Sequence, residues 1–463
     1  MHLGHSRFPL VDLVSHVNAV LLSVVPTAKL PAEQLDAGAA LNVWKRHRTD
    51  HDLRPKAIWD EQENCYFGFF YDWQNKNQEI PSIAFKIRTN RKPSPAVVQF
   101  LRMFFAIIDK DHAVLSSLND NWEDTWASLK ATQFQRSIAR CLGFDALDAN
   151  SWISMMESAA NMTYEGTASQ ITVVIPKKIT DLRASVGIKA YISLGGYIDL
   201  REALFDEKWV RAMVDGHRVA LVADKRNRGR VSGFLSLTVL PECNDPNPYA
   251  PHESLRLLQA HLSTGGIALT MAANRDLYVM SGKGVFWRKH QGRWRIIDCN
   301  ILAQELEASL LSPRIALEIT RMCLDLSFER KGALICIVDP EITDLPALVV
   351  DYDAEARVNA PLRRALQGAN VTEWGKRQII SAAAGTDGAT IIDQNGKVRD
   401  IACMVADPPP YRLKAAGFSV CKAFAGARSR AAWNASLFGI AIKVSEDGPI
   451  SMMKAGREVC TIG

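Results

Sequence analysis

Two arginines that flank a serine, Arg428 and Arg430 around Ser429, follow Gly426 and precede a helix-like run at 431–435. Guanidinium groups bind phosphate oxygens through a rigid fork of N–H donors. The first N–H groups of a helix have no partner within the helix, and the helix dipole makes this end attractive to anions. The segment is therefore suited to a polyphosphate. Solvated surface charge is the alternative interpretation.

An aspartate followed by two small residues, in Asp387, Gly388 and Ala389, begins an apolar run that ends in a Gln-Asn-Gly turn at 394–396. Small residues allow a flat ligand to approach the backbone closely. The carboxylate is suited to bind a metal ion or to act as a base. The same tripeptide is also common in ordinary turns, so this segment alone does not define a site.

Carboxylates also stand at the end of another apolar run, where Glu446 and Asp447 follow Ser445. Oxygen ligands of this kind hold divalent ions such as Mg²⁺. Acidic residues at a strand end are otherwise simply solvated. A further apolar run at 332–338 begins with a glycine and predicts a buried strand.

The residues around these segments predict an α/β domain that positions them. Pro241 to His252 contains four prolines in twelve residues. Neither helix nor sheet continues through such a segment, because proline lacks the backbone donor and fixes φ. We therefore place the main domain boundary there and assign 251–463 to the C-terminal domain. Its apolar runs predict helices at 254–262 and 303–328, and strands at 265–270, 276–280, 284–288, 294–298, 332–338, 387–393 and 440–444.

Two further regions are predicted before this domain. Residues 1–165 are expected to be mostly helical with one inserted hairpin, and 166–250 to form an α/β segment with a sensory or regulatory role. The apolar stretch at 10–25 carries polar residues at helical spacing, which favours an amphipathic helix over a signal peptide. Apolar residues spaced three to four apart predict helices at 11–24, 31–46, 95–108 and 122–142.

Two unusual segments lie within these regions. The dense aromatic run at 65–73, with the alternating run at 82–88, predicts a buried hairpin. A ligand-binding patch is the alternative. The basic segment 225–230 follows a predicted strand and is either a solvated loop or a phosphate contact.

The composition is that of an ordinary packed protein. Hydrophobic residues make up 48% and charged residues 23% of the 463 residues, and the net charge is only +5. Such a charge does not by itself indicate nucleic acid or a membrane surface. The nine cysteines are scattered without a CxxC pair, which favours reduced, buried thiols in a cytoplasmic protein. No apolar run reaches the roughly 18 residues of a membrane span.

The order of the C-terminal segments resembles the diadenylate cyclase domain of DNA-integrity scanning proteins and membrane-bound cyclases. Gly-Ala-Leu comes first, then Asp-Gly-Ala with its strand and turn, then Gly-x-Arg-x-Arg-Ala-Ala, and last a strand that ends in Ser-Glu. The segment Ala406-Asp-Pro-Pro-Pro410 is similar to a proline-containing loop of some members. The resemblance is clear over 315–463, faint over 254–314 and absent before 250.

This resemblance implies a mixed central β-sheet flanked by helices, preceded by the separate helical and α/β regions. It also implies a nucleotidyltransferase that condenses two ATP into the second messenger cyclic di-AMP and pyrophosphate. Two catalytic domains would meet face to face, in a homodimer or a higher oligomer. Mg²⁺ or Mn²⁺ would be the cofactor, and the N-terminal region would regulate the reaction.

The resemblance also implies roles for individual residues. Asp387 would lie near the metal and the 3′-hydroxyl of ATP and help to remove its proton. Arg428 and Arg430 would clamp the phosphates, and Glu446 would be a metal ligand with help from Ser445. The implied nucleotide-binding residues are Gly332, Ala333, Leu334, Gly388, Ala389, Gly426 and Ser429.

One motif departs from the family pattern. The phosphate motif of the family reads Gly-Thr-Arg-His-Arg, whereas 426–430 reads Gly-Ala-Arg-Ser-Arg here. Loss of one charge-assisted phosphate contact costs about 2–3 kcal/mol. A sensor that binds ATP or a cyclic dinucleotide without turning it over is therefore the alternative function. A DNA-binding scaffold is the third hypothesis, and the absence of a basic recognition helix argues against it.

Overall fold

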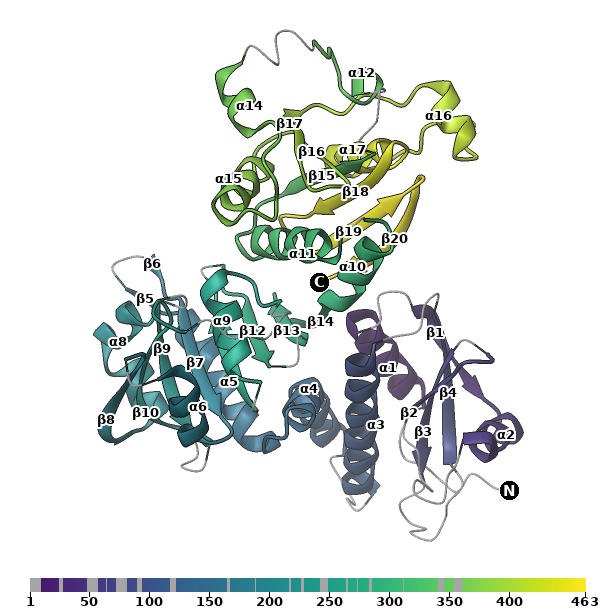
Figure 1. Cartoon of the computed structure of the whole chain (residues 1–463). Coiled ribbons are helices and arrows are strands. Elements are labelled where there is room, and N and C mark those ends of the chain that lie inside the picture. The colour runs from purple at the N-terminus through teal and green to yellow at the C-terminus, as the bar shows by residue number, and fades with distance from the viewer. Residues whose placement is uncertain are drawn as a thin grey trace. The chain divides into compact units, whose positions relative to one another are not determined.

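The computed structural model of the chain (Figure 1) has mixed α/β architecture and divides into two compact units. The first unit comprises 1–236, 262–281 and 286–296, and the second comprises 237–261, 282–285 and 297–463. The structure describes residues 10–24, 28–47, 57–63, 65–71, 81–89, 94–116, 122–164, 167–187, 189–215, 218–225, 229–241, 249–263, 265–272, 274–282, 285–310, 312–339, 345–353 and 360–463.

The first unit begins with a four-stranded antiparallel sheet in the order β1-β4-β3-β2. Helix α2 places Val43 and Trp44 against Phe67 and Phe69 in one buried cluster. The aromatic run is therefore a buried hairpin, as its pattern predicts, as far as the described residues 65–71 extend. The elements are α1 (Leu10–Val24), β1 (Ala28–Leu35), α2 (Ala37–His47), β2 (Ala57–Asp60), β3 (Cys65–Tyr71) and β4 (Pro81–Thr89).

The helix predicted at 31–46 is wrong in its first part, because β1 occupies 28–35 and α2 begins only at Ala37. Pro31 lacks a backbone donor and is tolerated in a strand at a sheet edge. The β1–β4 register shifts between Lys29 and Glu33, so the strand is irregular where the proline lies. Apolar spacing alone did not separate this bulged edge strand from a helical turn.

Helix α1 is amphipathic, as predicted, with Leu13, Val17 and Leu21 buried. Within the part of the chain that the structure describes, no helix is both long and apolar enough to cross a membrane. The other helices of this region are α3 (Pro95–Ser116), α4 (Trp122–Cys141) and α5 (Ala146–Ala160).

An eight-stranded mixed sheet follows, in the order β14-β13-β12-β11-β7-β9-β10-β8. β7 and β9 pair in parallel, and β11 pairs antiparallel with β7 from Gly266↔Pro176 to Met271↔Ile171. The strands at 266–298, expected in the C-terminal domain, are thus hydrogen-bonded into this sheet. Its elements are β7 (Ile171–Pro176), β8 (Tyr191–Ile198), β9 (Val219–Asp224), β10 (Arg230–Ser236), β11 (Gly266–Met271), β12 (Leu277–Ser281), β13 (Val285–His290) and β14 (Arg293–Asp298), with α6 (Ile179–Val186), α7 (Leu200–Phe205), α8 (Lys208–Met213) and the ribbon β5 (Thr163–Tyr164) and β6 (Thr167–Ala168).

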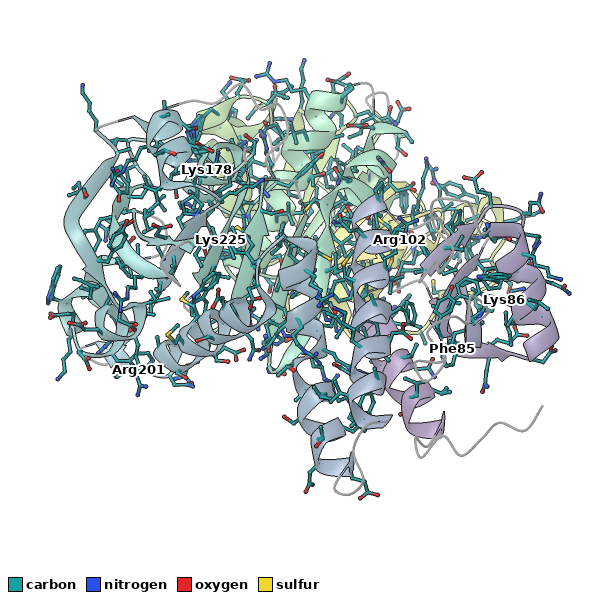
Figure 2. All side chains as sticks on the ribbon, turned by 90° about the horizontal axis from the view of Figure 1, so that it is seen from below. Phe85, Lys86, Arg102, Lys178, Arg201 and Lys225 are labelled. Carbon is teal, nitrogen blue, oxygen red and sulfur yellow. The ribbon has the colours of Figure 1, made fainter. Side chains whose placement is uncertain are left out.

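The basic segment at 225–230 lies partly outside the described residues, which exclude 226–228. Lys225, labelled in Figure 2, donates a hydrogen bond to the Gly143 carbonyl at 2.7 Å and lies over the Phe144 ring. Its ammonium therefore ties the segment to the end of α4. The Lys225 ammonium therefore has partners within the protein, and its position is explained without a bound phosphate.

The second unit is built on a six-stranded mixed sheet in the order β17-β16-β15-β18-β19-β20. β15 pairs in parallel with β16 and antiparallel with β18. The described elements are α9 (Glu253–His261), α10 (Cys299–Glu307), α11 (Pro313–Phe328), β15 (Ala333–Val338), α12 (Leu345–Leu348), α14 (Pro361–Leu366), α15 (Trp374–Ala384), β16 (Ala389–Asp393), β17 (Val398–Cys403), α16 (Pro410–Ala415), α17 (Ala427–Ala435), β18 (Gly439–Val444), β19 (Ile450–Lys454) and β20 (Arg457–Ile462).

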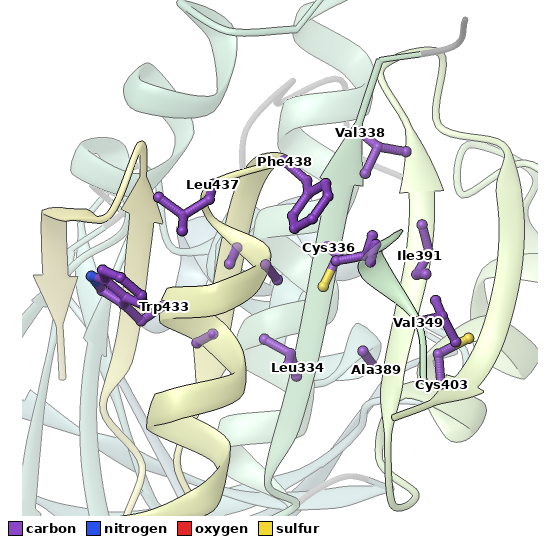
Figure 3. Close-up of a cluster of buried hydrophobic side chains, with 14 of the residues drawn as sticks. Leu334, Cys336, Val338, Val349, Ala389, Ile391, Cys403, Trp433, Leu437 and Phe438 are labelled. Atoms are coloured by element: carbon purple, nitrogen blue, oxygen red, sulfur yellow. The ribbon is translucent and has the colours of Figure 1, made fainter. Parts of the chain in front are cut away.

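One face of this sheet carries a continuous apolar core beneath α17 (Figure 3). Trp433 of α17 is 1% exposed and belongs to the same cluster as Leu334 and Cys336 of β15. The Trp433 indole N–H donates to the Gly456 carbonyl at 2.9 Å, so the buried polar atom is satisfied. This packing fixes α17, and with it the arginine segment, over β15 and β18.

The cysteines within the described residues are all free thiols, and most are buried. Burial raises the pKa of Cys336 and Cys323 well above the ordinary value, because the interior disfavours the thiolate. Both therefore act as small apolar core residues. This is the reduced, buried state that their positions in apolar runs predict.

Candidate functional site

The six-stranded sheet brings three of the predicted segments to one edge. Leu334 pairs with Ala389 in the parallel β15–β16 ladder, and Ala333 pairs with Val444 in the antiparallel β15–β18 ladder. The beginnings of β15 and β16 and the end of β18 consequently meet at the same edge. Gly332, Gly388 and Ser445 lie just beyond these paired residues.

Arg428 lies near the same edge, in the first turn of α17, which packs on one face of the sheet. Its guanidinium lies so close to Gly332 that a Cβ atom at position 332 would overlap it. Nη1 of Arg428 also donates to Oε1 of Glu446 at 3.1 Å. The Arg428 guanidinium thus connects its own segment, 426–430, with the start of β15 at Gly332 and the carboxylate of Glu446 after β18. With glycine at 332, the guanidinium lies directly against the backbone there.

Gly388 is constrained by both its own backbone and its surroundings. Its φ of 95° lies in the left-handed region, which glycine adopts without a steric penalty. A Cβ atom there would lie 2.6 Å from the carbonyl carbon of Ala402 on β17. The chain before β16 can therefore pass β17 closely only with glycine at this position.

We expect Gly388→Ala to destabilise the second unit by about 2–4 kcal/mol, since it adds a steric overlap to an unfavourable φ. Gly417→Ala is the matched control, because Gly417 also has positive φ but no atom near its added Cβ. Its expected cost is about 1 kcal/mol, from the backbone alone. Chemical denaturation of both variants measures the difference. Equal losses would contradict the close approach of β16 and β17.

Asp387 stands immediately before this glycine and its side chain is exposed. In the described part of the chain it has no hydrogen-bond or ion-pair partner. The neighbouring Thr386 is occupied locally, because its hydroxyl donates to the Ala383 carbonyl at 2.6 Å. The Asp387 carboxylate is therefore accessible at the site edge and is not used to hold the fold together.

Arg430 pairs with a different carboxylate from Arg428. Its Nη2 lies 2.6 Å and 2.9 Å from the two carboxylate oxygens of Asp407, and Asn434 donates to the same carboxylate at 3.0 Å. Both partners of the ion pair are more than half exposed, at 53% and 58%. Such a pair contributes about 0–1 kcal/mol to folding. Asp407 was missed as a site residue, and the proline-rich loop around it was the available signal.

Ser429 faces β18. Nζ of Lys443 donates to Oγ of Ser429 at 3.1 Å, in a partly buried setting. The sequence pattern did not identify Lys443, because it stands inside the apolar run at 440–444. Only the packing of α17 on β18 shows that this lysine lies beside the arginine segment.

The remaining predicted residues contribute backbone and shape. Ala333, Leu334 and Ala389 are at most 3% exposed and form part of the sheet core. Gly426 is the N-terminal cap residue of α17, and no side chain caps the helix there. The first N–H groups of α17 therefore lie beside Arg428 without a side-chain acceptor at the cap.

The carboxylates proposed as metal ligands are exposed. Glu446 is 67% exposed and paired with Arg428, and Asp387 is exposed at the start of β16. Over the described ranges, no group of three or more His, Cys, Asp or Glu side chains is arranged to hold a metal ion. The carboxylate oxygens present are of the type that Mg²⁺ and Mn²⁺ accept.

Comparisons with known proteins give no family assignment. No protein-family model matches the chain, and no curated protein matches it. Among solved structures, a hypothetical membrane-spanning protein from Bacillus cereus is 22% identical over 31% of this chain and 61% of its own, with a TM-score of 0.22. A double cysteine mutant of DacA from Staphylococcus aureus is 20% identical over 31% of this chain and 83% of its own, with a TM-score of 0.20. The match spans less than two thirds of the first of these proteins, and likenesses at this level carry no functional conclusion.

Proposed function

We propose that this chain is a metal-dependent diadenylate cyclase, which condenses two ATP into cyclic di-AMP and pyrophosphate. The observation that carries the proposal is the position of Arg428, which lies against Gly332 and donates to Glu446. A guanidinium of the arginine segment thereby contacts two other predicted segments, the one at 332 and the one at 446. Their order is the one that resembles the cyclase domain, so their convergence supports a shared site.

The arginine segment is suited to hold the triphosphate. Arg428 offers a planar fork of donors at the start of α17, and Gly426 leaves the first N–H groups of that helix without a side-chain cap. Negative charge is stabilised at this end of a helix. The phosphates would displace Glu446 as the acceptor of the Arg428 hydrogen bond.

The proposed reaction needs two copies of the site. The 3′-hydroxyl of one ATP attacks the α-phosphorus of the opposite ATP, the bond from phosphorus to the pyrophosphate oxygen breaks, and the hydroxyl proton passes to a base. A second attack in the reverse sense closes the ring. A two-fold dimer supplies both nucleophile and electrophile in the right orientation. We assign the base role to Asp387, because its carboxylate is exposed at this edge.

Mg²⁺ or Mn²⁺ would be held by Asp387 and Glu446 together with phosphate oxygens. Mg²⁺ is commonly bound through one or two carboxylates plus substrate phosphates, and two exposed carboxylates fit that mode. When bound, such an ion supplies positive charge beside the leaving pyrophosphate. The N-terminal region, residues 1–250, would regulate the reaction.

Binding without turnover is the second candidate function. Arg428 and Arg430 are each paired with a carboxylate, Glu446 and Asp407 respectively. A ligand must replace both pairs before the arginines clamp its phosphates. A site of this kind would also suit a sensor that binds ATP or a cyclic dinucleotide and releases it unchanged.

Incubation of the purified chain with ATP and Mn²⁺ or Mg²⁺ separates the two functions. We expect mass spectrometry to detect cyclic di-AMP and a coupled assay to detect two pyrophosphates for each molecule formed. GTP and an ATP–GTP mixture test base preference in the same experiment. Tight ATP binding without pyrophosphate release would contradict the cyclase and identify the sensor.

A further inference from the structure

Lys443 lies on the same side of the sheet as the arginine segment. It pairs with Leu334 across the β15–β18 ladder, and side chains of directly opposite residues share one face. Leu334 belongs to the core beneath α17. The Lys443 stem therefore runs between β18 and α17, and its ammonium reaches Ser429 in the first turn of the helix.

The charge of this ammonium is not balanced locally. Arg428 and Arg430 each pair with a carboxylate. Among the described residues, Lys443 has Ser429 as its polar partner and no carboxylate. The positive end of a helix dipole disfavours a cation in its first turn. Lys443 thus places an ammonium in the first turn of α17 with a hydroxyl and no carboxylate as its described partner, a local mismatch that is typical of functional positions.

In its hydrogen bond with Lys443, the Ser429 hydroxyl is the acceptor. A hydroxyl has one proton and two acceptor lone pairs. Since the ammonium donates to Oγ, the hydroxyl proton remains for another acceptor, and the neighbouring charge polarises it. An ammonium and a polarised hydroxyl in the helical turn that also carries Arg428 would together offer donors to the oxygens of a phosphate group.

We propose that Lys443 is a phosphate-binding residue of this site, which acts directly and through Ser429 on the triphosphate. The inference rests on the proposed function, since the anion it assigns is the triphosphate of ATP. It adds a third positive side chain to the site. Ser429 itself cannot carry a positive charge, so Lys443 supplies the cation at that position of the turn, in addition to Arg428 and Arg430.

Isothermal titration calorimetry of the full chain tests this assignment, with ATP, inorganic tripolyphosphate and adenosine as separate probes. We expect Lys443→Met to weaken ATP and tripolyphosphate binding about 10- to 100-fold, the range for a lost charged contact, and to leave adenosine binding unchanged. Lys443→Arg retains the charge and should keep most of the affinity. Thermal unfolding without ligand checks that each variant is folded.

Lys454→Met is the matched control. Lys454 lies on β19 of the same sheet, and its Nζ donates to Oγ of Ser309 at 3.2 Å in an exposed setting. The same kind of Lys–Ser hydrogen bond is thereby removed without touching the candidate site. We expect this variant to bind ATP and tripolyphosphate as the native chain does.

The possible outcomes separate the inference from the proposed function. If ATP binds equally to the native chain and to folded Lys443→Met, the lysine assignment is overturned and the cyclase proposal stands. If tripolyphosphate binding depends on Lys443 but ATP does not bind, the anion site is upheld and the cyclase proposal fails. If neither probe binds the native chain, both fail. Equal losses in Lys443→Met and Lys454→Met would also overturn the assignment.

Discussion

Replacing Asp387 with asparagine is expected to abolish cyclic di-AMP formation, lowering its rate by about 100- to 10,000-fold, the usual contribution of a positioned base. The side chain is exposed and has no partner among the described residues, so an isosteric amide breaks no contact that holds the fold. The amide cannot accept the 3′-hydroxyl proton. Product formation measured by mass spectrometry gives the loss, and the unfolding temperature should stay within a degree or so of the native value.

The control for this variant is Asp206→Asn. Asp206 is an exposed aspartate of the first unit, outside the candidate site, and its replacement should leave the rate unchanged. Full activity in Asp387→Asn would remove Asp387 from the mechanism. A matching loss of activity and of thermal stability would instead make it a structural residue.

Truncating Arg428 to alanine is expected to weaken ATP binding by about 10- to 100-fold or more, because it removes charge-assisted hydrogen bonds to the phosphates. The effect on stability should be small, since the Arg428–Glu446 pair is substantially exposed, at 35% and 67%, and such pairs contribute about 0–1 kcal/mol. Calorimetry with ATP and thermal unfolding without ligand measure the two effects separately.

Arg430→Ala provides the comparison within the same helix. Arg430 is held by both carboxylate oxygens of Asp407, whereas Arg428 makes a single, longer hydrogen bond to Glu446. Arg430 is therefore harder to release to a phosphate, and we expect a smaller loss of ATP affinity than for Arg428→Ala. A larger loss of ATP affinity in Arg430→Ala than in Arg428→Ala would mean that Arg430, and not Arg428, makes the main phosphate contact. If both variants merely unfold, the arginines are structural and the phosphate assignment is wrong.

The strands that carry the site were predictable because their signals are local. The run at 332–338 predicts a buried strand, and β15 occupies Ala333–Val338. Gly332 indicated where this strand starts, but the sequence did not indicate which residue would contact the glycine. The Arg428 guanidinium lies against this glycine, where a Cβ atom would overlap it, and that contact depends on how α17 packs. A tertiary contact of this kind leaves no trace in the periodicity of either segment.

The long helix predicted at 303–328 is two helices, α10 ending at Glu307 and α11 beginning at Pro313. Pro313 fits the first turn of a helix, where its missing N–H is not needed, and it cannot continue a preceding helix without strain. Each helix buries one apolar face, so the spacing of three to four residues recurs on both sides of the break. The proline was the signal that should have ended the first helix.

Pairings between distant segments were beyond the sequence pattern. β11 joins β7 across almost a hundred residues, and a period of two gives no information on the partner strand. The Lys443–Ser429 and Arg430–Asp407 contacts depend on the register of β18 and on the path of the proline-rich loop in the same way. The candidate residues were therefore predictable from their types and order, whereas their partners were not.

Hydrogen–deuterium exchange of the Asp387→Asn variant with and without ATP and Mg²⁺ tests the central claim, that one edge of the six-stranded sheet binds the triphosphate. This variant should bind ATP without consuming it. We expect ATP to slow exchange together at 331–334, 386–389, 426–431 and 445–447, and to leave the eight-stranded sheet unchanged. Saturating ATP that protects none of these four segments, or protects only the first unit, would contradict the account.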